Sequence, residues 1–119
     1  MSEIRTTTIS DKAGTGPVAL TGQSAAKAWV NYTSTTTTAA NGSFNISSLT
    51  DTGTGNTEIN FTNSFSDIYY AADGITEAIG IVVTDAAHAI GSANHRTYNT
   101  ASAPIDRGNV NASFQGDLA

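Results

Sequence analysis

The stretch that decides the fold is residues 43–62, SFNISSLTDTGTGNTEINFT, in which two runs of alternating apolar and polar residues flank a short polar segment. Phe44 and Ile46 are two positions apart in the first run, as are Ile59 and Phe61 in the second. Side chains two positions apart lie on the same face of a strand, and this spacing is typical of a half-buried strand. The sequence therefore predicts two strands, each with one apolar and one polar face.

The segment that joins these two strands, residues 51–56, contains only Asp, Thr, Gly and Asn. These residues favour turns, because Gly adopts backbone conformations closed to other residues and Asp and Asn side chains bond to nearby backbone. We expect the chain to reverse direction here. The central element of the protein is thus predicted to be a β-hairpin.

The rest of the chain is also predicted to be β-rich. A single helical turn is expected at residues 24–28, a polar bridge at residues 33–42 and a turn at Asp73–Gly74. The other extended segments that we predict are residues 3–10, 18–21, 29–32, 65–70, 78–83, 96–100 and 109–115. Six to eight short strands with little helix indicate a mainly β fold, a small antiparallel β-sandwich or barrel-like body.

The chain is predicted to divide into an extended N-terminal arm, residues 1–22, and a β-rich body, residues 24–119. The apolar residues of the arm that we expect to take part in attachment are Ile4, Ile9, Val18 and Leu20. The large apolar residues of the body that we expect to bury against each other or across a subunit axis are Trp29, Phe44, Ile46, Ile59, Phe61 and Phe114. This apolar set is thin for a monomer, and unsealed sheet edges tend to be covered by partner chains, so we expect an obligate oligomer.

Composition excludes several classes of protein. The 119 residues suffice for one domain, and only 13% of them are charged, with a net charge of −5. The five basic residues are scattered, so we expect no binding to nucleic acid. The chain has no cysteine for disulfides or thiolate metal sites, and no apolar run long enough to span a membrane. The N-terminus shows no apolar signal-peptide core.

Residues with catalytic or metal-binding chemistry are sparse. Asp85 and His88 have the spacing of a metal-ligand pair on a helix, but no third ligand is indicated, so a surface location is favoured. No nucleophile-elbow motif or recognisable pair of carboxylates occurs. Tyr69 or Tyr70 could stack on a sugar, but core packing is the favoured interpretation. We therefore predict that the protein is not an enzyme and binds neither a metal nor a cofactor.

Several segments resemble a known family. They are the opening IRTTTISD…GPVALT, QSAAKAWVNY at residues 23–32, SFNISSLTDTGTGN at residues 43–56, residues 61–70, and the ending GDLA. Together they resemble the small tail-fibre-like virion structural proteins of marine tailed bacteriophages and prophages. The matches cover most of the chain, and residues 71–108 match least.

This resemblance implies a homotrimeric virion protein on the tail or capsid surface, assembled in the host cytoplasm. The leading hypothesis is a tail fibre or appendage whose arm docks on another virion protein, such as a tail hub, an adaptor or the capsid. A contact with host-surface glycan is left open. The alternative is a capsid cement protein that stabilises the head, and a more remote alternative is a glycan-binding or glycan-degrading module.

Overall fold

The computed structural model describes residues 2–3, 7, 25–78, 80–85 and 88–119. Within these ranges the chain forms eight strands and no helix, and hence no helix that could cross a membrane. The strands are β1 (Ala28–Thr33), β2 (Ala39–Phe44), β3 (Ile46–Gly53), β4 (Asn56–Phe61), β5 (Ala71–Thr76), β6 (Ile81–Asp85), β7 (Ser92–Tyr98) and β8 (Val110–Gln115).

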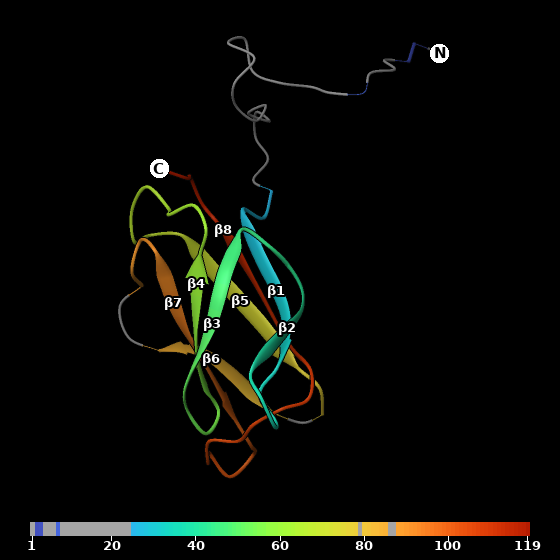
Figure 1. The fold of residues 1–119 in the computed structure, drawn as a ribbon, viewed down its shortest axis with the longest axis vertical. Helices are drawn as coiled ribbons and strands as arrows, with labels where there is room; N and C mark the ends of the chain where they lie inside the picture. Colours follow the sequence, from blue (N-terminus) through green and yellow to red (C-terminus); the bar gives the residue numbers. More distant parts are fainter. Residues whose placement is uncertain (1, 4–6, 8–24, 79, 86–87) are drawn as a thin grey trace.

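The strands form two four-stranded sheets (Figure 1). Sheet A has the order β2-β1-β8-β5, and sheet B has the order β3-β4-β7-β6. Every neighbouring pair in both sheets is antiparallel. The prediction of a mainly β, antiparallel fold is confirmed, and the two separate sheets make it a sandwich.

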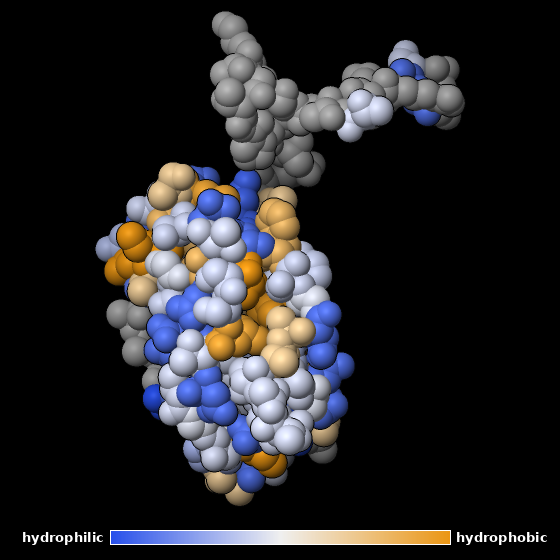
Figure 2. Space-filling model, in the orientation of Figure 1, coloured by the Kyte–Doolittle hydropathy of each residue, from blue (hydrophilic) through white to orange (hydrophobic). Residues whose placement is uncertain are grey.

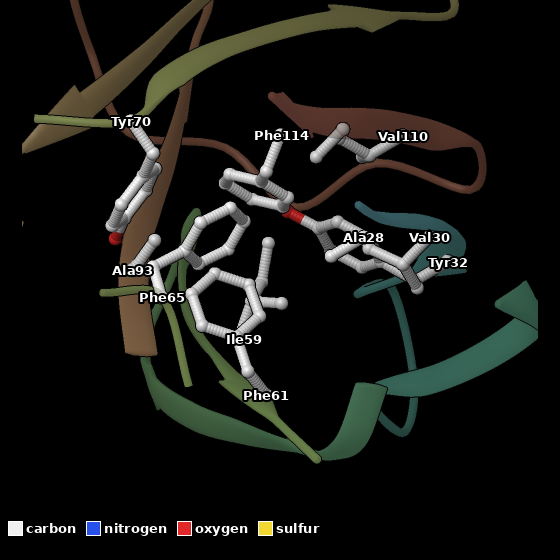
Figure 3. Packing of buried hydrophobic residues seen from close by; sticks show 11 residues of the cluster. Ala28, Val30, Tyr32, Ile59, Phe61, Phe65, Tyr70, Ala93, Val110 and Phe114 are labelled. Carbon is white, nitrogen blue, oxygen red and sulfur yellow. The ribbon is translucent and has the colours of Figure 1, made fainter. Parts of the chain in front are cut away.

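The hydrophobic core lies between the two sheets, as the close view in Figure 3 shows. Phe61 of sheet B packs edge-on against Phe114 of sheet A, with ring centroids 5.1 Å apart. The buried apolar residues are Ala28, Val30, Tyr32, Ile59, Phe61, Phe65, Tyr70, Ala93, Val110, Ala112 and Phe114. The strict alternation of buried and less buried positions in β1, β4, β7 and β8 produces this core, because successive strand residues point to opposite faces.

The predicted central hairpin is present as β3 and β4, which pair from Ile46 opposite Phe61 to Gly53 opposite Asn56. Its turn is tighter than predicted, because only Thr54 and Gly55 lie between the two strands. Gly55 has a φ of 66°, a backbone conformation that glycine adopts without steric cost.

One prediction about this hairpin is wrong. Phe44 and Ile46 do not lie on one strand, because Phe44 ends β2 in sheet A and Ile46 begins β3 in sheet B. The residue between them, Asn45, has a φ of 57° and redirects the chain from one sheet to the other. Asparagine tolerates this left-handed conformation better than most residues do. The alternating pattern continues through the break, so the sequence alone hides it.

Other local predictions also need correction. Asp73 and Gly74 lie inside β5 and form no turn. Residues 33–42 were predicted as a bridge but contain most of β2, and residues 65–70 form no strand apart from an isolated bridge between Phe65 and Leu118. The described part of the predicted helical turn is not helical, since the backbone N–H of Lys27 donates to the carbonyl of Phe114 at 2.8 Å and Ala28 begins β1.

The predicted N-terminal arm falls almost wholly outside the described residues. Its four apolar residues, Ile4, Ile9, Val18 and Leu20, all lie outside them. The arm therefore stays a prediction.

Candidate functional site

Two rows of outward-facing side chains cross β1, β8 and β5 on the outer face of sheet A. Antiparallel pairing gives each row one residue from each strand. The first row is Trp29, Ser113 and Asp73, and the second row is Asn31, Asn111 and Ile75. These residues face outward because the residues that alternate with them in β1 and β8, such as Val30 and Ala112, are buried in the core.

The largest side chains on this face are aromatic and exposed. Trp29 is 43% exposed, and Phe44, its neighbour across the β1–β2 pair, is 56% exposed. The indole lies toward β2, since a Cβ on Gly42 would be 3.6 Å from the indole atoms Cζ3 and Cη2. Two neighbouring exposed aromatic residues on a sheet face indicate a contact surface.

Polar side chains on the same face are linked to one another. The hydroxyl of Ser113 donates to Oδ1 of Asp73 at 2.6 Å. Nδ2 of Asn31 donates to Oδ1 of Asn111 at 2.7 Å, and Nδ2 of Asn41 donates to Oδ1 of Asn31 at 2.9 Å. These bonds hold the side chains in defined orientations and leave other polar atoms of the same groups turned to solvent.

A groove of about 430 Å³ lies between these aromatic and polar groups, and we call it the sheet A groove. Its walls are Trp29 and Val30 from β1 on one side and Asp73, Gly74 and Ile75 from β5 on the other. Its floor is formed by three residues of β8, Asn111, Ala112 and Ser113. This volume falls in the range of roughly 300–1,000 Å³ that is common for small-molecule sites.

The interior behind the groove contains a buried polar pair. Tyr32 and His95 are linked at 2.8 Å through the tyrosine hydroxyl and the imidazole Nδ1, across the two sheets. Burial raises the pKa of Tyr32 to about 12 and lowers the pKa of His95 to about 4. Both groups are therefore neutral at pH 7, and the imidazole tautomer decides which of these two atoms donates the proton. The other imidazole nitrogen, Nε2, has no hydrogen-bond partner among the described residues.

A second, smaller cleft lies where β2 passes into β3. It has a volume of about 220 Å³, and its apolar lining includes Ile46 and Leu49, which pack against the core. Figure 2 shows apolar surface gathered near the middle of the face where β2 and β3 lie. Alanine, serine and threonine side chains make up the rest of its wall, and none of the described residues that line it is charged.

The structure separates the residues that the sequence grouped as packing residues. Ile59, Phe61 and Phe114 lie in the core, and Ile46 packs against it from a partly buried position. Trp29 is outside the core because it alternates out of phase with the buried residues of β1, and Phe44 lies opposite it on β2, a strand with no buried residue. The expectation that these two side chains bury within one chain is not met. Packing of these two residues across a trimer axis stays a prediction.

The sequence predicts a surface position for His88, and the structure places this residue in a half-buried position. The imidazole stacks on the ring of Tyr70, with centroids 4.4 Å apart. Among the residues that the structure describes, no group of three or more His, Cys, Asp or Glu residues could hold a metal ion.

Sequence reasoning missed the groove because its residues come from three strands that are distant in the chain. One local signal was available in the sequence of β1, AWVNYT. Trp29 is two positions from the polar Asn31, so the two side chains lie on the same face of the strand. The other face of the strand carries the apolar residues Ala28, Val30 and Tyr32, so this pattern places Trp29 on the outer face. The neighbours Asp73 and Asn111 could not be found without knowledge of the strand order.

Comparisons of this chain with protein-family models, with curated proteins and with solved structures give no match.

Proposed function

We propose that this chain is a structural, non-enzymatic protein of a tailed-bacteriophage particle, a tail-fibre or appendage module. In this proposal the sandwich uses the outer face of sheet A as a contact surface, and residues 1–22 attach it to another virion protein. The observation that carries the proposal is the exposed pair Trp29 and Phe44, on a domain whose core is filled without them.

The positions of the segments that resemble phage virion proteins also support the proposal. Residues 23–32 contain most of β1, and residues 43–56 contain the crossover at Asn45 and most of the β3–β4 hairpin. These segments build the scaffold of the sandwich. The likeness thus includes one strand of sheet A and the hairpin of sheet B, whereas β5, β6 and β7 lie in the stretch that matches least, residues 71–108.

The chemistry of the sheet A groove favours binding over catalysis. Among the described residues that line it, Asp73 is the only one with an ionisable side chain. General acid–base catalysis usually needs a second group positioned to exchange a proton with the substrate. Glycoside hydrolysis in particular uses a pair of carboxylates.

The first test is the copy number of this protein per purified virion, measured by quantitative mass spectrometry against the major capsid protein. A small multiple of three supports a tail or appendage location. A copy number near that of the capsid protein, or a simple fraction of it, would replace this proposal with a capsid cement protein. Absence from the particle would contradict a virion role altogether.

The arm and the trimer are tested separately. We expect light scattering of the purified protein to give three times the chain mass of 12.2 kDa. Deletion of residues 1–22 should leave the body folded and abolish incorporation into virions. Normal incorporation of the truncated chain would show that attachment uses another part of the molecule.

A further inference from the structure

We infer that the sheet A groove binds a neutral saccharide, with one sugar ring stacked on Trp29 and its hydroxyl groups bound by Asp73 and Asn111. This inference deepens the proposed function and rests on it, since it names the ligand class of the same contact face.

Trp29 provides the platform. Its indole is supported from the side of β2 by the close approach of Gly42, and 43% of the residue is exposed. One face of a pyranose ring presents C–H groups, which pack against the electron-rich face of an indole. Trp offers this contact at low cost in conformational entropy, because only two torsions have to be fixed.

The polar groups beside the platform match sugar hydroxyls. A hydroxyl both donates and accepts, so it needs an acceptor and a donor close together. Asp73 uses Oδ1 to accept from Ser113, and its Oδ2 has no partner among the described residues. Asn111 uses Oδ1 to accept from Asn31, which leaves its Nδ2 group to donate. The groove thus offers a charged acceptor and an amide donor from adjacent strands.

These polar groups are oriented before any ligand arrives. Nε2 of Gln115 donates to the hydroxyl of Ser113 at 3.0 Å, which in turn donates to Asp73. On the other row, Asn41 donates to Asn31, and Asn31 donates to Asn111. Side chains that are already ordered lose little entropy on binding, which raises affinity.

Charge and backbone pairing exclude the main competitors. Among the described residues of the groove the one charged side chain, Asp73, is negative, and the chain carries a net charge of −5, so a phosphate or another anionic ligand is disfavoured. An added peptide strand needs a free sheet edge, but β8 under the groove is paired on both sides, with β1 and β5. A wholly apolar ligand would cover Oδ2 of Asp73 and Nδ2 of Asn111 without giving them hydrogen-bond partners.

Trp29 is the only tryptophan of the chain, so its fluorescence reports directly on the groove. The experiment is a titration of the purified full-length protein with neutral hexoses, N-acetylhexosamines and their short oligomers. Sialylated and sulfated oligosaccharides serve as anionic counterparts. We expect a saturable change in Trp29 emission and protection from acrylamide quenching with at least one neutral sugar.

Variants then assign the binding to the groove. Asp73→Ala keeps the fluorescent probe and should weaken binding about tenfold or more, the usual consequence of losing a hydrogen bond to a charged group. Trp29→Ala, followed by calorimetry, should abolish binding. The matched control is Tyr69→Ala, which removes an 86% exposed aromatic side chain outside the groove and should leave affinity unchanged. Circular dichroism and light scattering confirm that each variant keeps its fold and its oligomeric state.

Four outcomes would overturn the inference. They are no binding of any neutral sugar at millimolar concentration, binding of anionic sugars only, binding unaffected by both groove variants, and dissociation of an oligomer by Trp29→Ala. The last outcome would make this face an interface between copies of the chain. A protein found in virions that binds no sugar refutes this inference alone, whereas a sugar-binding protein absent from virions refutes the virion role alone.

Discussion

His95 links the interior of the sandwich to the pH of the surroundings. Its imidazole is buried between the sheets, and burial lowers its pKa from 6.5 to about 4 because the charged form loses hydration. The unfolded chain therefore takes up the proton at a higher pH than the folded chain does. The contribution of His95 to the free energy of unfolding is therefore fully present above pH 6.5 and is lost as the pH drops toward 4.

We predict that His95 alone makes the free energy of unfolding fall by about 2 kcal/mol between pH 7 and pH 5. Urea unfolding at pH 7 and at pH 5 gives the change in the free energy of unfolding for the wild type and for His95→Gln. The difference between these two changes is the contribution of His95. His88→Gln, a change at the only other histidine of the sequence, is the comparison variant for loss of a histidine side chain. Equal pH dependence in wild type and His95→Gln would show that His95 does not couple folding to protonation.

Gly74 shows why single residues can mislead sequence reasoning. The pair Asp73–Gly74 predicts a turn, yet both residues lie in β5. The glycine is needed there for a tertiary reason, since a Cβ at position 74 would be 2.4 Å from Nε2 of His95. Glycine in a strand can mark such a close approach, and this information resides in the partner strand, which the local sequence does not identify.

At the scale of elements, the crossover at Asn45 joins the two sheets. The backbone N–H of Asn63 donates to Oδ1 of Asn45 at 2.7 Å, and Nδ2 of Asn45 donates to the carbonyl of Asn63 at 3.1 Å. The backbone N–H of Thr62 donates to the carbonyl of Asn45 at 3.0 Å. The side chain thus ties the crossover to the end of β4 while the backbone holds a positive φ.

We predict that Asn45→Ala destabilises the protein by about 1–2 kcal/mol, because it loses these side-chain bonds and strains the left-handed backbone. Asn45→Gly should cost less, since glycine relieves the strain and loses only the bonds. Chemical denaturation measures both variants, with Ser48→Ala on the exposed face of β3 as the control. A cost for Asn45→Gly equal to or above that of Asn45→Ala would show that backbone strain contributes nothing here.

The elements that the sequence predicts well are those with a clean period of two. The inward faces of β4, with Ile59 and Phe61, and of β8, with Val110, Ala112 and Phe114, follow directly from alternation. Prediction fails at β2, where AANGSF carries only one large apolar residue, Phe44, and this residue points outward. An edge strand with few inward contacts leaves little pattern to detect. The strand order, and with it the groove, depends on contacts distant in sequence.

At the scale of the whole molecule, one filled core coexists with an outer face that carries its own aromatic residues. Phe114 is fully buried and contacts the rings of Phe61 and Tyr70, whereas Trp29 meets solvent on the opposite side of sheet A. The inner face of sheet A thus stabilises the fold, and the outer face of the same sheet is free to contact other molecules. This division lets the outer face be changed without loss of the fold.

We predict that Phe114→Ala destabilises the protein by about 3–5 kcal/mol, whereas Trp29→Ala costs about 1 kcal/mol or less. The reason is that the first change opens a cavity in the core and the second removes a side chain already half in water. Urea unfolding followed by circular dichroism compares them at two protein concentrations. A large, concentration-dependent cost for Trp29→Ala would show that copies of the chain cover this residue.

The position of β8 has a consequence for how the protein is made. It is the last strand of the described chain, yet it lies in the middle of sheet A, between β1 and β5. The four strands of sheet B leave the ribosome earlier and can pair without it, but β1 and β5 have to wait for their shared partner. The floor of the sheet A groove is thus synthesised after both of its walls, and a chain that stops before residue 110 has no such groove.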